Sequence, residues 1–181
     1  VMTGRLDMAI IHGAGPIKGV NFMPLMKENF FLVAHADFGF GTDTATPVKL
    51  SDLAQTPLLV PPDYNFVRKR INVAFARKQI VPNIVAEVEA LLTLRDAVAA
   101  GLGCTILPSA VARTIVVTGQ SLIYPPSSPT IQENVSLCIP ESIPETEAGV
   151  AVRELLVLLA QHMVTSQNWP GTQMADPPPA E

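Results

Sequence analysis

Residues 87–108 read EVEALLTLRDAVAAGLGCTILP, and the fold class can be inferred outward from this segment. Leu91, Leu94 and Val98 are three and four positions apart, a spacing that places side chains on one face of an α-helix. Gly101 follows the last of these turns, and glycine most readily adopts the left-handed conformation that closes a helix. The pattern therefore predicts a helix over residues 91–100 that packs through this face.

Short apolar segments on both sides of this helix predict strands. Residues 82–89 precede the helix and residues 105–107 follow it, while residues 57–60 form another such segment upstream. A second helix, over residues 65–79, is expected between the strands at residues 57–60 and 82–89. Strands that alternate with helices at this spacing predict an α/β fold with a largely parallel sheet.

The expected helix over residues 65–79 is the clearest amphipathic segment of the chain. Val67, Ile71 and Phe75 recur every four residues and predict one core-facing stripe. The basic residues on its other faces have two interpretations, a solvated helix face or a positive field that attracts an acidic small molecule. The other faces carry five of the twelve basic residues, which are Arg68, Lys69, Arg70, Arg77 and Lys78.

Composition excludes several classes of protein. The chain has 181 residues, of which 48% are hydrophobic and only 15% charged, and its formal net charge is −4. Such a composition excludes general disorder and is typical of one domain or two small lobes with much buried surface. An acidic chain is a poor candidate for gripping nucleic acid by itself, because phosphate neutralisation dominates such binding. No apolar run reaches the length of about 18 residues that a membrane span requires, and we expect no membrane association.

The two ends of the chain carry separate expectations. The apolar run Met8–Ile11 is typical of a strand buried on both faces of a parallel sheet. No crossover helix precedes it, so we expect the chain to start in the middle of a domain. Residues 145–164 predict a last helix. Residues 167–181 hold few apolar side chains and predict a disordered, proline-rich tail.

No catalytic, metal or cofactor constellation emerges from the sequence. A Gly-x-Ser-x-Gly nucleophile elbow does not occur, and Gly101 and Gly103 follow a helix, whereas a phosphate loop follows a strand. Cys104 and Cys138 lack metal-ligand spacing and are expected to be reduced, partly buried thiols of a cytoplasmic protein. We therefore predict no enzyme activity, no metal and no cofactor.

The sequence nevertheless resembles a known family over residues 4–165. The segment GRLDMAI at residues 4–10, LSDLA at residues 50–54 and the whole of residues 87–108 follow the order of motifs in one family. They resemble the effector-binding domain of LysR-type transcription regulators, and are most similar to its nitrogen-assimilation-control branch.

This resemblance implies a two-lobed fold like that of type 2 periplasmic binding proteins. The first lobe would come from residues 1–30 and 131–166, and the second lobe from residues 31–130. The first lobe would be incomplete at its N-terminus, because the family places two strands and two helices ahead of the matched segment. The DNA-binding winged helix-turn-helix and a linker helix would precede those elements.

The resemblance also implies a function and a site. The domain would sense a small, anionic effector bound between the lobes. The full-length homo-oligomer would transmit the signal to its DNA-binding domains in the cytoplasm. A free-standing solute-binding protein of the same fold and a degenerate enzyme remain as alternatives. The effector-binding residues that we predict are His12, Met23, Pro61, Asp63, Tyr64, Asn65, Phe66, Glu89, Leu92 and Thr93.

Overall fold

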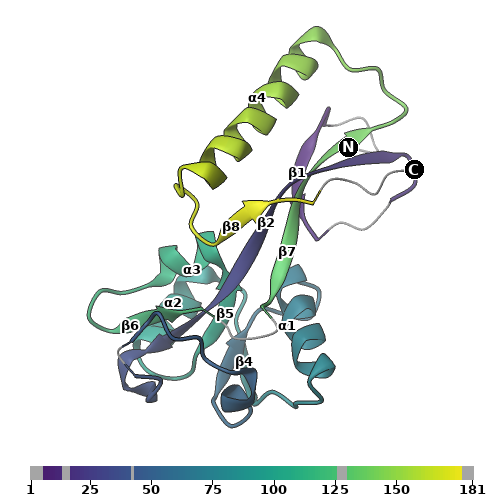
Figure 1. Cartoon of the computed structure of the whole chain (residues 1–181). Coiled ribbons are helices and arrows are strands. Elements are labelled where there is room, and N and C mark those ends of the chain that lie inside the picture. Colours follow the sequence, from purple (N-terminus) through teal and green to yellow (C-terminus); the bar gives the residue numbers. More distant parts are fainter. Residues whose placement is uncertain (1–5, 14–16, 42, 126–129, 177–181) are drawn as a thin grey trace. The chain divides into compact units, whose positions relative to one another are not determined.

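The chain forms two compact units in a computed structural model that describes residues 6–13, 17–41, 43–125 and 130–176. We call them lobe I, from residues 1–28 and 133–181, and lobe II, from residues 29–132. Strand β2 (Val20–His35) begins in lobe I and ends in lobe II, as Figure 1 shows. The predicted boundaries follow residues 30 and 130, whereas these units divide after residues 28 and 132.

Lobe I is built on an antiparallel sheet. Strand β1 (Ala9–His12) pairs antiparallel with β7 (Gln132–Pro140). Strand β8 (Thr172–Met174) pairs antiparallel with Met26–Glu28 of β2. The buried apolar side chains of this lobe form a small cluster of Leu25, Met26, Val135, Leu137, Ala160 and Val164.

One long helix, α4 (Glu147–Thr165), belongs to lobe I. It begins after Thr146, whose Oγ1 accepts a hydrogen bond from the Gly149 amide at 3.1 Å. Its inner face contributes to the cluster, whereas Leu155 on its outer face is 63% exposed. By length and composition alone, α4 is the one described helix that could cross a membrane, a test that core helices of soluble proteins also pass.

Two predictions for lobe I are wrong. The strand at Met8–Ile11 is not doubly buried in a parallel arrangement: β1 pairs antiparallel with β7, and Ile10 is 49% exposed. An apolar run does not specify strand direction, and here the partner comes from the far end of the chain. The predicted disordered tail is instead ordered over residues 167–176. Backbone hydrogen bonds between β8 and β2 supply stabilisation that its few apolar side chains do not. Residues 177–181 lie outside the described residues.

Lobe II alternates strands and helices, and its larger core lies between them. After β2 its elements are the 3-10 helices η1 (Ala36–Phe38) and η2 (Leu50–Leu53), β3 (Leu58–Val60), α1 (Phe66–Arg77), β4 (Ile84–Glu87), α2 (Leu91–Ala99), β5 (Thr105–Pro108), α3 (Ser109–Ile115) and β6 (Ser121–Tyr124).

The expectation of a largely parallel sheet is wrong. Among the described strand pairs, only β3 and β4 run parallel, with one further parallel bridge between Leu58 and Cys104. Strand β2 pairs antiparallel with β5 and with β6. The alternation of strands and helices identified the α/β class, but the long strand β2 meets neighbours that run back against it.

The two helices that flank β4 pack as their spacing predicts, with one exception. Val67, Ile71 and Phe75 of α1 are buried, as are Leu94 and Val98 of α2. Leu91, the first residue of α2, was expected to face inward but is 40% exposed, and its neighbours in the first turn are exposed as well.

Two glycines after α2 have separate structural reasons. Gly101 has a φ of +72°, the left-handed conformation expected at the end of a helix. A Cβ on Gly103 would lie 2.8 Å from Leu59 Cγ and 2.9 Å from the Pro57 carbonyl oxygen, so only glycine fits there. Both glycines therefore have a structural role.

Candidate functional site

The candidate site lies where two parallel strands of lobe II end side by side. Strand β3 ends at Val60 and β4 ends at Glu87, and the Val88 amide donates a hydrogen bond to the Val60 carbonyl at 2.9 Å. Two loops, residues 61–65 and 88–90, then lead into the N-termini of α1 and α2. In open α/β sheets, ligands bind outside the carboxyl ends of the strands, at such loops.

The first loop has both structural and exposed residues. Asn65 Oδ1 accepts a hydrogen bond from the Val67 amide at 2.9 Å, so Asn65 is the N-cap of α1. Pro61 is buried and Phe66 packs against the core of lobe II. Tyr64, by contrast, is 63% exposed. The structure therefore gives some of the predicted site residues a role in folding and leaves others open to a ligand.

The second loop leaves a helix N-terminus without a side-chain cap. Ala90 precedes α2 and supplies no capping hydrogen bond, unlike Asn65 before α1. Leu92 and Thr93, in the first turn of α2, are both exposed. The first amides of a helix need partners and carry the positive end of the helix dipole, so this terminus is suited to an anionic group.

A hydrogen bond joins the two loops. Tyr64 Oη donates to Glu89 Oε1 at 2.5 Å. This bond, burial and the nearby carboxylates of Glu89, Asp63 and Glu87 raise the pKa of Tyr64 above its ordinary value. Three of the predicted residues, Asp63, Tyr64 and Glu89, are therefore brought together, and the charge around them is negative.

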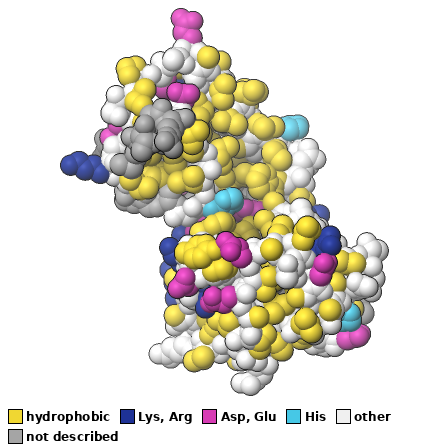
Figure 2. Space-filling view, turned by 180° about the vertical axis from the view of Figure 1, so that it is seen from behind, with side chains coloured by type: hydrophobic (Ala, Val, Ile, Leu, Met, Phe, Trp, Pro, Cys, Tyr) yellow, Lys and Arg dark blue, Asp and Glu magenta, His cyan; other side chains and the backbone are white. Residues whose placement is uncertain are grey.

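The basic face of α1 is partly neutralised at this point. Arg68 Nη1 lies 2.7 Å from Glu87 Oε1 and also donates to the Pro61 carbonyl at 3.2 Å, while Nε donates to Asn72 Oδ1 at 3.1 Å. On the face shown in Figure 2, acidic and basic side chains are interspersed with apolar ones. The Arg68–Glu87 pair could not be predicted from the sequence, because the two residues come from different elements.

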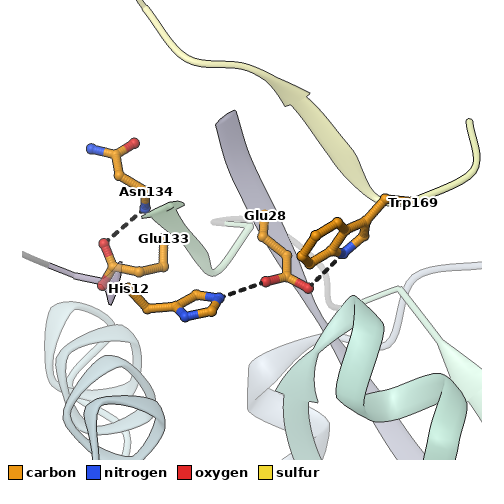
Figure 3. A network of polar contacts seen from close by, with 5 residues as sticks. All are labelled: His12, Glu28, Glu133, Asn134 and Trp169. Carbon is orange, nitrogen blue, oxygen red and sulfur yellow. Dashed lines mark hydrogen bonds and ion pairs between the residues drawn. The ribbon is translucent and has the colours of Figure 1, made fainter. Parts of the chain in front are cut away.

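The two remaining predicted residues, His12 and Met23, belong to lobe I. The His12 ring points toward the buried carboxylate of Glu28, and its Nε2 lies 3.0 Å from Oε2, as Figure 3 shows. Met23 packs against the apolar cluster of lobe I. Glu28 was not among the predicted residues, although a charged residue within a largely apolar strand is a recognisable signal.

The two cysteines, Cys104 and Cys138, are buried and do not form a disulfide. Burial raises the pKa of the Cys104 thiol to about 12 and also raises the pKa of Cys138. A thiol of this kind is a poor nucleophile and a poor redox sensor, because the thiolate is the reactive form. Among the described residues, no group of three or more His, Cys, Asp or Glu side chains could hold a metal ion.

Comparison with known proteins identifies the family. The model of the LysR substrate binding domain matches residues 1–163 of the chain. This chain belongs to the LysR substrate-binding domain family. Membership supports the two-lobed, type 2 periplasmic-binding-protein-like fold that the motifs implied.

The relatives of this LysR domain are transcriptional regulators. The nitrogen assimilation regulatory protein nac of Klebsiella aerogenes is 31% identical over 159 residues, which cover 88% of this chain and 50% of that protein. The chain therefore spans about half the length of this relative.

Solved LysR-type regulatory domains share the fold. The regulatory domain of CcmR from Synechocystis, in complex with 2-PG, matches with a TM-score of 0.78 at 12% identity, over 89% of this chain and 76% of that one. The effector-binding domain of QuiR, in complex with shikimate, matches with a TM-score of 0.72 at 19% identity, over 88% of this chain and 74% of that one. At these identities the likeness establishes the fold alone.

Proposed function

We propose that this LysR domain senses a small molecule for a cytoplasmic, homo-oligomeric transcription regulator whose DNA-binding domain lies outside this chain. The effector would bind at residues 61–65 and 88–93 of lobe II, with His12 and Met23 as further contacts from lobe I. The observation that carries the proposal is the meeting of two strand ends and two helix N-termini, one of them uncapped, in a chain of this family.

The charges at the loops favour an effector with two kinds of polar group. An anionic group suits the uncapped N-terminus of α2, where the Thr93 hydroxyl is also exposed. Near Tyr64 the carboxylate of Glu89 would repel an anion and accept hydrogen bonds from hydroxyl groups. We therefore propose a small hydroxylated anion.

Thr93→Ala in the full-length regulator tests this assignment. Loss of one hydrogen bond to a charged ligand weakens binding by about 1.5–3 kcal/mol, or roughly tenfold to a hundredfold. We expect a higher effector concentration for the half-maximal response and an unchanged affinity for DNA. Thr114→Ala is the matched control, because Thr114 is also an exposed helix residue but lies in α3. An unchanged response in Thr93→Ala contradicts the assignment.

Direct binding gives a second test that needs no knowledge of the target DNA. Shikimate is the first compound to titrate into this chain, because it is a hydroxylated carboxylate, and chemical-shift changes of backbone amides are the measurement. The proposal expects the largest changes at Leu91, Leu92 and Thr93. Saturable changes confined to other parts of the chain contradict the location of the site.

A further inference from the structure

The segment that follows α4 is fixed to β2 by three contacts. We call residues 166–176 the C-terminal strap. Its strand β8 pairs with Met26–Glu28, and the Trp169 indole Nε1 donates a hydrogen bond to Glu28 Oε1 at 3.0 Å. Within the strap, the Thr172 hydroxyl donates to the Trp169 carbonyl at 2.6 Å and orders the turn into β8. Asp176, at the end of the strap, forms an ion pair with Lys27 of β2. The strap therefore holds β2 through its backbone and through two side chains, those of Trp169 and Asp176.

Glu28 is the anchor of this arrangement. Its side chain is 1% exposed, and its two carboxylate oxygens each have a donor or partner from a different segment, Trp169 at Oε1 and His12 at Oε2 (Figure 3). An indole N–H can only donate, so Oε1 must accept. A buried carboxylate is costly unless such partners are present, and each partner in turn depends on the carboxylate. Glu28 thus couples the strap to β1 through β2.

Glu28 lies at the boundary between the two lobes. Glu28 is the last residue of β2 in lobe I, and Asn29 is the first residue of lobe II. Strand β8 covers the last three residues of β2 before that division. The strap therefore stabilises β2 where the chain passes from one lobe to the other.

We propose that the C-terminal strap is a detachable clasp. It sets how readily β2 loses its backbone hydrogen bonds at Met26–Glu28, where the chain passes from lobe I to lobe II. With the strap docked, the backbone of Met26–Glu28 is paired with β8; with the strap released, this part of β2 loses those hydrogen bonds. In a domain that senses an effector, a clasp at this point would tune the response from outside the β3–β4 loops. Only this regulatory meaning rests on the proposed function.

Amide hydrogen exchange of the free chain tests the clasp without any ligand. Trp169→Phe keeps an aromatic ring and removes the N–H donor, so we expect exchange at Met26–Glu28 to accelerate about tenfold, with exchange at Leu32 and Val33 unchanged. Gln173→Ala is the control, because Gln173 is an exposed strap residue outside the Trp169–Glu28 bond. Unchanged exchange at Met26–Glu28, or equal acceleration in both halves of β2, overturns the proposal.

Trp169 offers a second readout, because it is the one tryptophan in the 181 residues. Acrylamide quenching of its fluorescence measures how exposed the indole is. We expect Glu28→Leu, which removes both acceptors and keeps a buried side chain, to raise the quenching constant at least twofold, and Glu28→Gln, which retains one carbonyl acceptor, to raise it less. An unchanged constant in Glu28→Leu overturns the clasp. Neither measurement requires an effector, so a failed clasp leaves the effector proposal standing, and a failed effector assignment leaves the clasp standing.

Discussion

The two lobes achieve their stability by different means. Lobe II buries one large apolar cluster that draws on β2, β3, α1, α2, β5 and α3, and Ile71 at its centre is 0% exposed. Lobe I has a small cluster, leaves the outer face of α4 exposed and buries the carboxylate of Glu28. Burial of apolar surface is the main favourable term in folding. Lobe II is therefore held mainly by packing, whereas lobe I depends more on backbone pairing and polar contacts.

The reactivity of the two cysteines gives the largest expected difference. At pH 8 a thiol with a pKa of about 12 has roughly a thousandth of the thiolate of one with the ordinary value of 9. We expect Cys104, in lobe II, to react with iodoacetamide at least a thousandfold more slowly in the native chain than after unfolding. Mass spectrometry of alkylated peptides checks this rate, and Cys138 in lobe I should react first. Faster labelling of Cys104 contradicts the prediction.

The same thiol predicts a dependence of stability on pH. Because the pKa of Cys104 is higher in the folded than in the unfolded chain, folding favours the protonated form. Its contribution is present in full below pH 9 and is lost as the pH rises from about 9 toward 12. Urea unfolding of Cys104→Ala beside the wild type should show a shallower loss of stability over this range. Parallel curves for the two proteins would contradict it.

Truncation of an apolar side chain should cost much more unfolding free energy in lobe II than in lobe I. Phe75→Ala removes a ring that is 1% exposed in lobe II, and we expect it to cost about 3–5 kcal/mol of unfolding free energy. Leu155→Ala in lobe I removes a side chain that is 63% exposed and should cost less than about 0.5 kcal/mol. Urea denaturation measures both. Equal costs would show that α4 is covered in solution and that the contrast between the lobes is wrong.

A smaller effect tests how tightly lobe II is packed. Gly103→Ala would place a Cβ 2.9 Å from the Pro57 carbonyl oxygen, a backbone atom that cannot easily move. We expect a loss of about 1–3 kcal/mol, as for other overpacked sites. Gly119→Ala is a useful reference, because its Cβ would meet nothing within 4 Å and only its φ of +80° is strained. A smaller loss at Gly103 than at Gly119 would show that the packing can relax.

The smallest effect distinguishes the two helices of the site. Asn65→Ala removes the cap of α1 and should cost about 1 kcal/mol. Ala90→Asp adds a cap to α2, which lacks one, and should stabilise the chain by about 0.5–1 kcal/mol while its carboxylate blocks an anionic ligand. Thermal unfolding checks both signs. Destabilisation by Ala90→Asp would show that the end of α2 is already satisfied.

Local patterns predicted lobe II better than lobe I. The stripe of Val67, Ile71 and Phe75 and the closing Gly101 reflect interactions within a few residues, so the sequence reveals them. The pairing of β1 with β7 and of β8 with β2 joins residues from opposite ends of the chain, which periodicity does not record. The prediction of a largely parallel sheet was wrong because periodicity does not record which strands pair or in which direction they run.

The residues of the candidate site came from the family resemblance, and the contacts among them could not be predicted from the sequence. The resemblance implied Asp63, Tyr64 and Glu89 as site residues, and in the structure Tyr64 donates a hydrogen bond to Glu89. That Arg68 pairs with Glu87 and that Asn65 serves as a cap follow from side-chain geometry, which the sequence leaves open. The effector contacts themselves remain a prediction.

Strand β2 has a consequence for how this chain tolerates insertions. Alternate side chains of a strand point to opposite faces, so a residue inserted within it reverses the facing of every position beyond the insertion. An extra residue between Glu28 and Asn29 would spare the register on one side and turn Phe30 and Leu32 away from the core on the other. The evolutionary record of such a strand should therefore contain substitutions but few changes of length.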